Sequence, residues 1–392
     1  MWTGLENLLA NPSRWLGKAR AGMVTNPTAV DRRLRHAVDL LVADDSVALC
    51  RLFGPEHGVR GTAQEMVDVG DTVDPSSGLP VVSLYGTSYA SLAPQPETLA
   101  DLDVLLFDIQ DIGARYYTYQ ATLALCMRVA ARVGTKVLVL DRPNPIGGVQ
   151  VEGGGIAPGL ESFCGLYPIP QRHGLTVGEL ARLYNEAFAL GCELDVVPCS
   201  GWERHLYFDA FDVSELPWVM PSPNMPTLDT ALVYPGMCLL EGTNLSEGRG
   251  TTRPFELFGA PFINAEQLAA ELIALRLPGV AFRVCTFEPT FHKWQGELCA
   301  GLQLYVTNRE TFNAYQTGLA VLWAVKKLWP EQFGWRAEPY EFRDDVPAID
   351  LLTGFPEVRE AIDAGRPYAD VLNAALHDTE QFDAARPEAL MY

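Results

Sequence analysis

Short apolar runs that alternate with amphipathic helix patterns are the feature that most constrains how this chain can fold. Such runs suit strands that are buried on both faces of a parallel sheet. Helical periodicity fills residues 31–44 and 123–133 between them, and a capping-box pattern at Thr176 and Glu179 begins a further helix. This βαβ alternation predicts a Rossmann-like, open, mostly parallel α/β domain. The apolar runs of strand length are residues 22–25, 47–53, 104–109, 137–140 and 193–197.

The pattern changes after about residue 258, where a smaller α+β domain is expected. We therefore predict a Rossmann-like catalytic domain over residues 1–258 and a C-terminal domain over residues 259–392 that closes the cleft. The proline-rich stretch from Trp218 to Pro235 has no clear periodicity and predicts an ordered loop over the first domain. The elements expected in the second domain are helices near 264–276 and 310–328 and strands at 280–287 and 300–306.

Charge and cysteine spacing exclude several classes of partner and indicate a compartment. The formal net charge is −20, so the average surface repels nucleic acid and anionic membranes. No apolar stretch has the length of a spanning helix, and the N-terminus does not resemble a signal peptide. The eight cysteines lie singly, which favours reduced thiols over disulfides or a zinc site. These features predict a cytoplasmic protein with a small-molecule substrate.

Polar residues follow each of the first four apolar runs, at the point where the strand is expected to end. In an open parallel sheet these points lie together along the carboxyl edge, where ligands bind. Asp, Asn, Gly and Pro also favour turns, so ordinary capping is the alternative explanation for any single residue. The candidates at this edge are Asn26 after the first run, Glu56 and His57 after the second, Asp108, Gln110, Asp111 and Arg115 after the third, and Arg142 and Asn144 after the fourth.

Glu56 and His57 stand out because glycines and a proline surround them in the sequence Gly-Pro-Glu-His-Gly. This setting is typical of a positioned acid, and in such a site partial burial or a neighbouring carboxylate can raise the pKa of a carboxyl group. Glu56 could then protonate a leaving oxygen near neutral pH, although a salt bridge to a neighbour such as Arg60 is the alternative. His57 has no HxH or HExxH partner, so we expect it to bind substrate or Glu56 rather than a metal.

Residues 241–256 (EGTNLSEGRGTTRPFE) form a second polar block, which includes Asn244, Glu247, Arg249 and Arg253. A glycine-rich loop of this kind can bring main-chain N–H groups and arginines around an anion or sugar hydroxyls. The alternative is an Arg–Glu network that joins the two domains. The patterns GxxxxGK[ST], GxGxxG and G-x-S-x-G are absent. Carboxylates accompanied by arginines and by tyrosines such as Tyr117 favour glycoside cleavage instead.

Motifs that run in order from about residue 20 to residue 260 make the sequence recognisable. They are MVTNPTAVD, LFGPEHGVRG, GLPVVSLYG, DVLLFDIQDIGARYYTY, VLDRPNPIGG, IPQRHGLTVGELA, PWVMPSPNMPTLDTALVYPG and EGTNLSEGRGTTRPFE. With them, and with weaker similarity through FRVCTFEPTFHKWQGELCAG and LLTGFPEVREAI, the chain resembles the exo-β-N-acetylmuramidase family of bacteria (NamZ type, formerly DUF1343). After Gly61 this chain reads TAQEMVD where the family more often has Ala-Gly-Glu, so no role is assigned to Glu65.

The resemblance implies a Rossmann-like catalytic domain, a smaller second domain and a site in the cleft between them. It implies hydrolytic release of terminal β-1,4-linked N-acetylmuramic acid (MurNAc) from the non-reducing end of peptidoglycan fragments, with Glu56 as the acid/base. Many members carry an export signal that this chain lacks, which suggests work on imported fragments. MurNAc bears a lactyl carboxylate, for which Arg249 and Arg253 are the first candidate contacts and Arg115 and Arg142 the next.

The second catalytic group stays open at this level. Asp108, Asp111 or Glu247 could act as base or nucleophile, or the substrate's own 2-acetamido group could attack. Two other functions stay open as well: a different carbohydrate or amide hydrolase, and a non-catalytic protein that clamps a muropeptide. We expect no metal and no cofactor. The expected substrate contacts are Asn26, Arg60, Gln110, Arg115, Tyr117, Arg142, Asn144, His173, Asn224, Asn244, Arg249 and Arg253.

Overall fold

Two β-sheets organise the computed structural model, which describes residues 1–61, 72–377 and 379–392. Within those residues the larger sheet has seven strands, and all neighbouring pairs are parallel except β3 with β4. The prediction of an open, mostly parallel sheet is therefore confirmed. In sheet order the strands are β3 (Thr72–Val73), β4 (Pro80–Ser83), β2 (Ala48–Gly54), β1 (Arg20–Thr25), β5 (Val104–Asp108), β6 (Lys136–Leu140) and β7 (Leu194–Val197).

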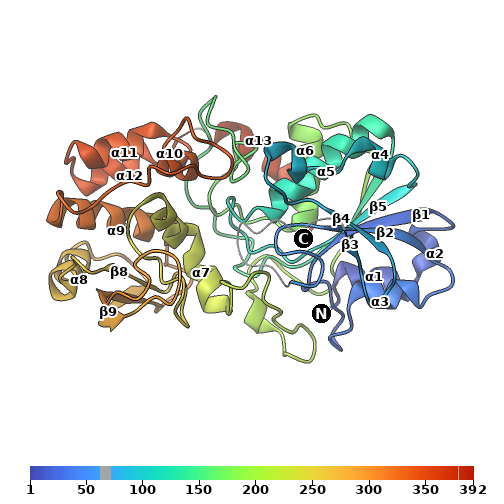
Figure 1. Ribbon diagram of the computed structural model, residues 1–392, viewed down its shortest axis with the longest axis horizontal. Coiled ribbons are helices and arrows are strands. Elements are labelled where there is room, and N and C mark those ends of the chain that lie inside the picture. The colour runs from blue at the N-terminus through green and yellow to red at the C-terminus, as the bar shows by residue number, and fades with distance from the viewer. Residues whose placement is uncertain (62–71, 378) are drawn as a thin grey trace.

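Helices cover both faces of this sheet (Figure 1). Met23 of β1 and Leu106 of β5 pack into the core on one face of the sheet. Their neighbours in sequence, Val24 and Phe107, pack into the core on the other face. Because successive side chains of a strand point to opposite faces, a strand covered on both sides is apolar at nearly every position. The helices are α1 (Gly4–Ala10), α2 (Pro12–Trp15) and α3 (Ala37–Val42) on one side, and α4 (Pro96–Leu99), α5 (Tyr119–Val133) and α6 (Val177–Ala187) on the other.

A smaller domain begins with α7, which packs on α9, and so starts before the boundary at residue 258 that the sequence suggested. It is built on an antiparallel sheet with the strand order β8-β10-β9 (Figure 1). Its last helix, α13, returns to the first domain, where Arg182 of α6 donates hydrogen bonds to the main-chain oxygens of Glu388 and Leu390. The chain therefore crosses between the two domains twice. The elements are α7 (Leu228–Met237), β8 (Leu257–Ala260), α8 (Ala265–Ala274), β9 (Val280–Phe287), β10 (Cys299–Val306), α9 (Ala314–Leu328), α10 (Ala348–Thr353), α11 (Pro356–Asp363), α12 (Tyr368–Ala374) and α13 (Glu380–Ala389).

Most elements expected from the sequence are present, with ends that differ by a few residues. The capping box that begins α6 is confirmed, because Thr176 and Glu179 exchange side-chain to main-chain hydrogen bonds of 3.0 and 3.2 Å. The helix expected over 31–44 begins only at Ala37, since Asp31 accepts hydrogen bonds from later N–H groups and holds the preceding residues in turns. Over the part of the chain that is described, no helix is long and apolar enough to cross a membrane.

The structure corrects one expectation, the loop from Trp218 to Pro235. Its second half is helix α7, which begins where the side chain of Thr227 accepts a hydrogen bond from the N–H of Thr230. Pro235 lies inside this helix and removes one helical hydrogen bond, after which the chain tightens into the 3₁₀ helix η3 (Cys238–Gly242). Because of its prolines, the sequence pattern did not predict this helix, which tertiary packing stabilises.

Helices α7 and α9 pack so closely at two glycines that their main chains are in contact. A Cβ atom on Gly236 would lie 1.7 Å from the main-chain oxygen of Ala314, and one on Gly318 would lie 2.1 Å from the main-chain oxygen of Gly236. The two helices thus meet backbone to backbone. Because η3 follows α7 directly, this contact also fixes the position of Glu241, which lines the cavity described below.

The buried carboxyl group of Asp141, just after β6, joins both ends of the chain to the large sheet. It accepts hydrogen bonds from the hydroxyl of Thr176 (2.8 Å), the N–H of Gly178 (2.8 Å) and the hydroxyl of Tyr392 (2.6 Å), while its main-chain oxygen accepts one from the N–H of Gly4 (2.8 Å). Burial raises the pKa of Asp141 to about 6, although these hydrogen bonds oppose the shift.

The contact between α7 and α9 yields a stability prediction. Replacing Gly318 with Ala should lower the free energy of unfolding by about 1–3 kcal/mol, because the new methyl group forces the helices apart. In an uncrowded helix the same change would stabilise by up to about 1 kcal/mol. Chemical denaturation measures the difference, with Gln316→Ala on the same helix as the control. A Gly318→Ala protein as stable as the wild type would show that the helices separate without cost.

The raised pKa of Asp141 predicts a pH-dependent contribution to stability. The folded chain binds this proton more tightly than the unfolded chain, so the contribution is complete below pH 4 and is lost as the pH rises through about 6. Relative to Asp141→Asn, the wild type should lose about 2 kcal/mol of unfolding free energy between pH 4 and pH 7. Denaturation curves across this range test it, with exposed Asp45→Asn as the control. Parallel pH profiles for wild type and Asp141→Asn would contradict it.

Candidate active site

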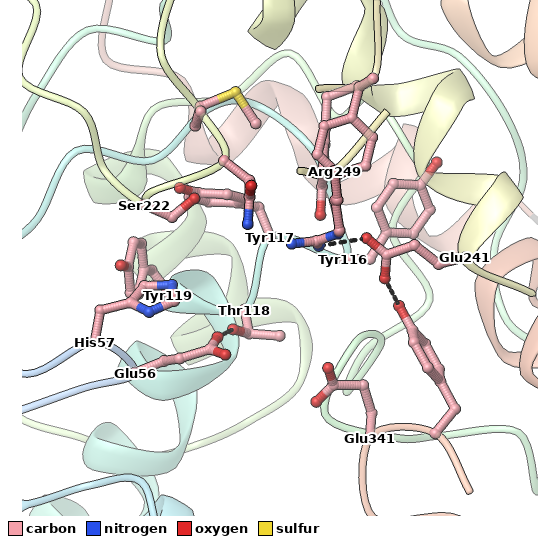
Figure 2. Close-up of a pocket in the computed structure, with 15 residues that line it drawn as sticks. Glu56, His57, Tyr116, Tyr117, Thr118, Tyr119, Ser222, Glu241, Arg249 and Glu341 are labelled. Carbon is pink, nitrogen blue, oxygen red and sulfur yellow. Dashed lines mark hydrogen bonds and ion pairs between the residues drawn. The ribbon is translucent and has the colours of Figure 1, made fainter. Parts of the chain in front are cut away.

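An open pocket, whose empty space of about 550 Å³ includes solvent at its mouth, lies where the loops of the large sheet meet the second domain (Figure 2). Its wall combines carboxyl groups, tyrosine rings and one arginine. Both domains contribute, since Glu56 follows β2 whereas Glu341 follows α9. The residues of the wall are Glu56, His57, Tyr116, Tyr117, Thr118, Tyr119, Ser222, Asn224, Met225, Tyr234, Glu241, Arg249, Phe255, Tyr340 and Glu341.

Glu56 is placed by a tight turn directly after β2. The N–H of Gly58 donates to the main-chain oxygen of Pro55 (2.8 Å), and His57 has a φ of +70°. A positive φ at the third position of a turn usually requires glycine or asparagine, so a histidine here is held in an unfavourable conformation. The turn presents the partly buried carboxyl group of Glu56 to the cavity, where the hydroxyl of Thr118 lies 3.5 Å from Oε2.

Tyrosines from one loop form much of the wall. The hydroxyl of Tyr119 donates to the main-chain oxygen of Pro221 (2.6 Å), and that of Tyr116 donates to the main-chain oxygen of Pro235. The ring of Tyr117 packs edge-on against Tyr119 and Tyr234, with centroids 5.3 and 5.6 Å apart. Burial raises the pKa values of these phenols, so the rings form a neutral wall.

A chain of alternating charges enters the cavity from the second domain. Glu241 accepts hydrogen bonds from Nη2 of Arg249 (2.7 Å) and from the hydroxyl of Tyr340 (2.7 Å) (Figure 2). Behind it, Nε of Arg249 lies 3.3 Å from buried Glu247, which also pairs with Lys293 at 2.9 Å. Burial alone would raise the pKa of Glu247, but these cations hold it well below its ordinary value.

Several residues predicted for the site lie in the cavity wall: Glu56, His57, Tyr117, Asn224 and Arg249. The sequence indicated each of them, by position after a strand, by a motif or by the polar block 241–256. Their placement brings the expected acid, an aromatic wall and a cation together. Residue Glu65 lies outside the described residues.

The other strand-end candidates lie outside the described cavity wall, where each of them bonds to neighbouring groups of the protein. Asp108 and Arg142 form a buried ion pair whose Nη2–Oδ2 distance is 3.1 Å. Asp111 accepts a hydrogen bond from the N–H of Gly113 (2.7 Å) and lies 3.5 Å from Nε2 of His173. The side chain of Asn26 accepts hydrogen bonds from Thr28, and that of Gln110 donates to the main-chain oxygens of Asp111 and Pro143. The side chain of Asn144 bonds to the main chain of Leu175 and Ile146.

The remaining candidates also lie outside the wall. Arg60 pairs with Asp74 and Asp39, both at 2.9 Å, which raises its pKa, whereas the alternative interpretation of the sequence had joined it to Glu56. The guanidinium of Arg115 is buried and donates to main-chain carbonyls. Arg253 pairs with Glu256 on the far side of the loop, Asn244 bonds to the main chain of Gln332 and Gly334, and Glu247 lies behind Arg249.

Among the wall residues of the second domain that sequence reasoning did not name as candidates, the polar residues Glu241, Tyr340 and Glu341 bear most on the chemistry of the site. Glu241 lies at the start of the polar block, which was singled out for its arginines rather than for this residue. Tyr340 and Glu341 belong to a segment with no periodicity, motif or turn signal. Only the path of the chain after α9 brings them to the cavity.

The fold and the cavity define the class of protein. An open α/β domain and a smaller α+β domain together enclose a cavity whose wall pairs carboxyl groups with aromatic rings. This combination is typical of a glycoside hydrolase, in which carboxyl groups act on the glycosidic bond.

Comparison with known proteins narrows this class to a family: the chain belongs to the exo-β-N-acetylmuramidase NamZ family. The N-terminal domain of the family matches residues 21–229, and its C-terminal domain matches residues 232–392. The chain is also similar to the peptidoglycan β-N-acetylmuramidase NamZ of Bacillus subtilis (strain 168). The two are 46% identical over 390 residues, which cover 100% of this chain and 91% of the relative.

Two solved structures share the fold, both crystal structures of DUF1343 family proteins from Bacteroides fragilis NCTC 9343. One, at 1.65 Å resolution, is 36% identical with a TM-score of 0.89, and the other, at 1.30 Å, is 28% identical with a TM-score of 0.77. Each match covers 100% of this chain and 98% of the solved one. The family and the fold class predicted from the sequence are thereby confirmed.

Proposed function

We propose that this protein is an exo-acting glycoside hydrolase that releases terminal β-1,4-linked MurNAc from the non-reducing end of peptidoglycan fragments. The observation that carries the proposal is the position of Glu56 in an aromatic-walled cavity of a chain that belongs to the NamZ family. The Bacillus subtilis relative is named a peptidoglycan β-N-acetylmuramidase and shares 46% of its residues with this chain over almost its whole length.

In the proposed reaction, Glu56 is the general acid. Its carboxyl group donates a proton to the glycosidic oxygen while the bond from that oxygen to the anomeric carbon breaks. The strained turn at His57 and the hydroxyl of Thr118 hold Glu56 in place. The rings of Tyr117 and Tyr119 offer apolar surfaces to the sugar, and their neutral phenols add no charge to a site that develops positive charge at the anomeric carbon.

Arg249 is the proposed partner of the lactyl carboxylate. Within the described wall it is the only lysine or arginine, so it is the one fixed positive charge there. Its guanidinium lies over the ring of Phe255, 5.1 Å from the centroid, and between Glu241 and Glu247. A substrate carboxylate would share this guanidinium with Glu241, so part of the charge on Arg249 is already balanced before substrate binds.

The proposal includes a location and a role: turnover of imported wall fragments in the cytoplasm. What supports it is the state of the cysteines, all of which lie in the described chain as free thiols, six of them buried. Secreted proteins more often carry disulfides. Cell fractionation with an antibody against the protein tests the location, and recovery from the medium or the cell surface would contradict it.

Replacing Glu56 with Gln should lower kcat about 10²- to 10⁴-fold, because the amide cannot donate the proton that the leaving oxygen needs. A chromogenic β-MurNAc glycoside measures this, beside its N-acetylglucosamine counterpart. Glu97→Gln, an exposed change on α4, is the control.

The outcomes separate the proposed function from its alternatives. Cleavage of another terminal sugar in preference to MurNAc would favour a different carbohydrate hydrolase. Tight binding of a muropeptide with no turnover by the folded wild type would favour a binding protein. A fully active Glu56→Gln enzyme would remove Glu56 from its assigned role.

Arg249→Ala should weaken the binding of MurNAc more than that of N-acetylglucosamine, since only MurNAc carries the carboxylate that the guanidinium would pair with. The expected loss is about 10-fold or more, the size of one charge-assisted hydrogen bond. Calorimetry with both sugars measures it. Because the change leaves Glu241 and Glu247 without this partner, Arg249→Lys is measured beside it.

Arg253→Ala is the matched control, because Arg253 lies on the same loop but outside the cavity wall. It should leave the binding of both sugars within about 2-fold of the wild type, as expected for a half-exposed pair. Equal losses for MurNAc and N-acetylglucosamine in Arg249→Ala would show that the arginine supports the cavity without recognising the carboxylate.

A further inference from the structure

We propose that Glu341 is the second catalytic carboxyl group of this site, the base that takes a proton from the attacking water. The inference rests on the proposed function, because it assigns a role in the same hydrolysis. It replaces the three candidates that the sequence suggested, Asp108, Asp111 and Glu247, none of which belongs to the described cavity wall.

The position of Glu341 is the first reason. It lines the same cavity as Glu56 but comes from the other domain. Figure 2 shows the two carboxyl groups pointing into one space from opposite sides. An acid on one side of the scissile bond and a base on the other is the arrangement that glycoside hydrolysis by direct water attack requires.

The backbone that carries Glu341 is the second reason. Tyr340 and Arg343 exchange main-chain hydrogen bonds of 2.9 Å, and the residues between them, Glu341 and Phe342, have φ values of +48° and +66°. Two successive positive φ values are typical of a type I′ turn, which favours Asn-Gly at these positions. A Glu-Phe pair is unfavourable there, and such strain tends to persist where it positions a functional group.

Contacts on every side hold this turn in its strained form. The hydroxyl of Tyr340 donates to Glu241, and the ring of Phe342 packs edge-on against Tyr85, with centroids 6.2 Å apart. The guanidinium of Arg343 donates to the main-chain oxygen of Glu161 (2.7 Å). Since Tyr85 and Glu161 belong to the first domain, the turn is fixed relative to Glu56.

Glu241 is the competing candidate, as the described wall holds three glutamates in all: Glu56, Glu241 and Glu341. Both oxygens of Glu241 accept strong hydrogen bonds, from Arg249 and Tyr340, each at 2.7 Å. Both oxygens of this carboxylate are therefore already engaged by protein groups. Glu241 therefore fits the role of holding Arg249 and the turn in place.

The proposed step balances as a hydrolysis with inversion. Water attacks the anomeric carbon from the face opposite the leaving oxygen, and Glu341 accepts one of the water protons. The bond from the anomeric carbon to the glycosidic oxygen breaks, and that oxygen receives the proton of Glu56. The products are MurNAc in the α configuration and the shortened saccharide, after which the proton returns from Glu341 to Glu56 through solvent.

The first test compares glutamine variants on the chromogenic β-MurNAc glycoside. Glu341→Gln should lower kcat about 10²- to 10⁴-fold with KM within about 3-fold of the wild type. Its pH profile should lose the acidic limb, which reports the base, whereas Glu56→Gln should lose the basic limb. Glu338→Gln, an exposed glutamate of the same segment, is the matched control.

The second test uses azide and nuclear magnetic resonance. Azide should restore turnover of Glu341→Ala at least about 10-fold and yield α-MurNAc azide, since azide needs no base but attacks the same face. Wild-type hydrolysis should release α-MurNAc first. Release of β-MurNAc first, or a β-azide product, would overturn the proposed role. So would a Glu341→Gln enzyme that keeps kcat while Glu241→Gln loses it.

A third measurement separates catalysis from folding. Glu341→Gly places glycine where φ is positive, so it should raise Tm by about 1–3 °C while abolishing turnover. A variant that lost both stability and activity would indicate a structural role and overturn the proposal. If the wild type cleaves no MurNAc glycoside, the proposed function fails instead, which is a distinct result.

Discussion

The buried guanidinium of Arg115 is the interaction on which the arrangement of the site depends. It donates hydrogen bonds to the main-chain oxygens of Gly155 (2.8 Å), Ile169 (3.2 Å) and Leu352 (2.6 Å), of which the last belongs to α10 in the second domain. Arginine suits this task because its planar donors satisfy several carbonyls at once. The next four residues, Tyr116 to Tyr119, all line the cavity, so fixing Arg115 fixes the aromatic wall and the Thr118 hydroxyl beside Glu56.

The described charged residues of the site alternate in sign and do not form a cluster of cations. A protein of net charge −20 that binds an anionic sugar was expected to gather cations around it. The described wall instead holds Arg249 beside Glu241, and Glu247 and Lys293 lie behind the wall. In the function proposed above, selectivity for a carboxylate would depend on this one guanidinium, whose position is set by its acidic neighbours.

Local patterns made much of the fold predictable. The runs that form β1, β5 and β6 are apolar because both faces of the sheet are covered. Nearly every residue of these strands is buried, so the pattern can be recognised from the sequence. Glu56 was found because its turn is encoded by neighbouring glycines and a proline. The strand-end residues Asp108 and Arg142 gave the same signal, but they form an ion pair with each other outside the described cavity wall. Glu341 gave no signal at all, since its turn lacks the usual residues and its place depends on the second domain.

The double crossing of the chain has a mechanical consequence. The second domain begins after the first domain is nearly complete, yet α13 and Tyr392 return to α6 and Asp141 of the first domain. The second domain is thus an insertion held by two connections, whereas a domain held by one linker can swivel freely. Two attachments restrict relative movement to a single hinge axis. Any opening for substrate between the two domains therefore has to occur as a rotation about that axis.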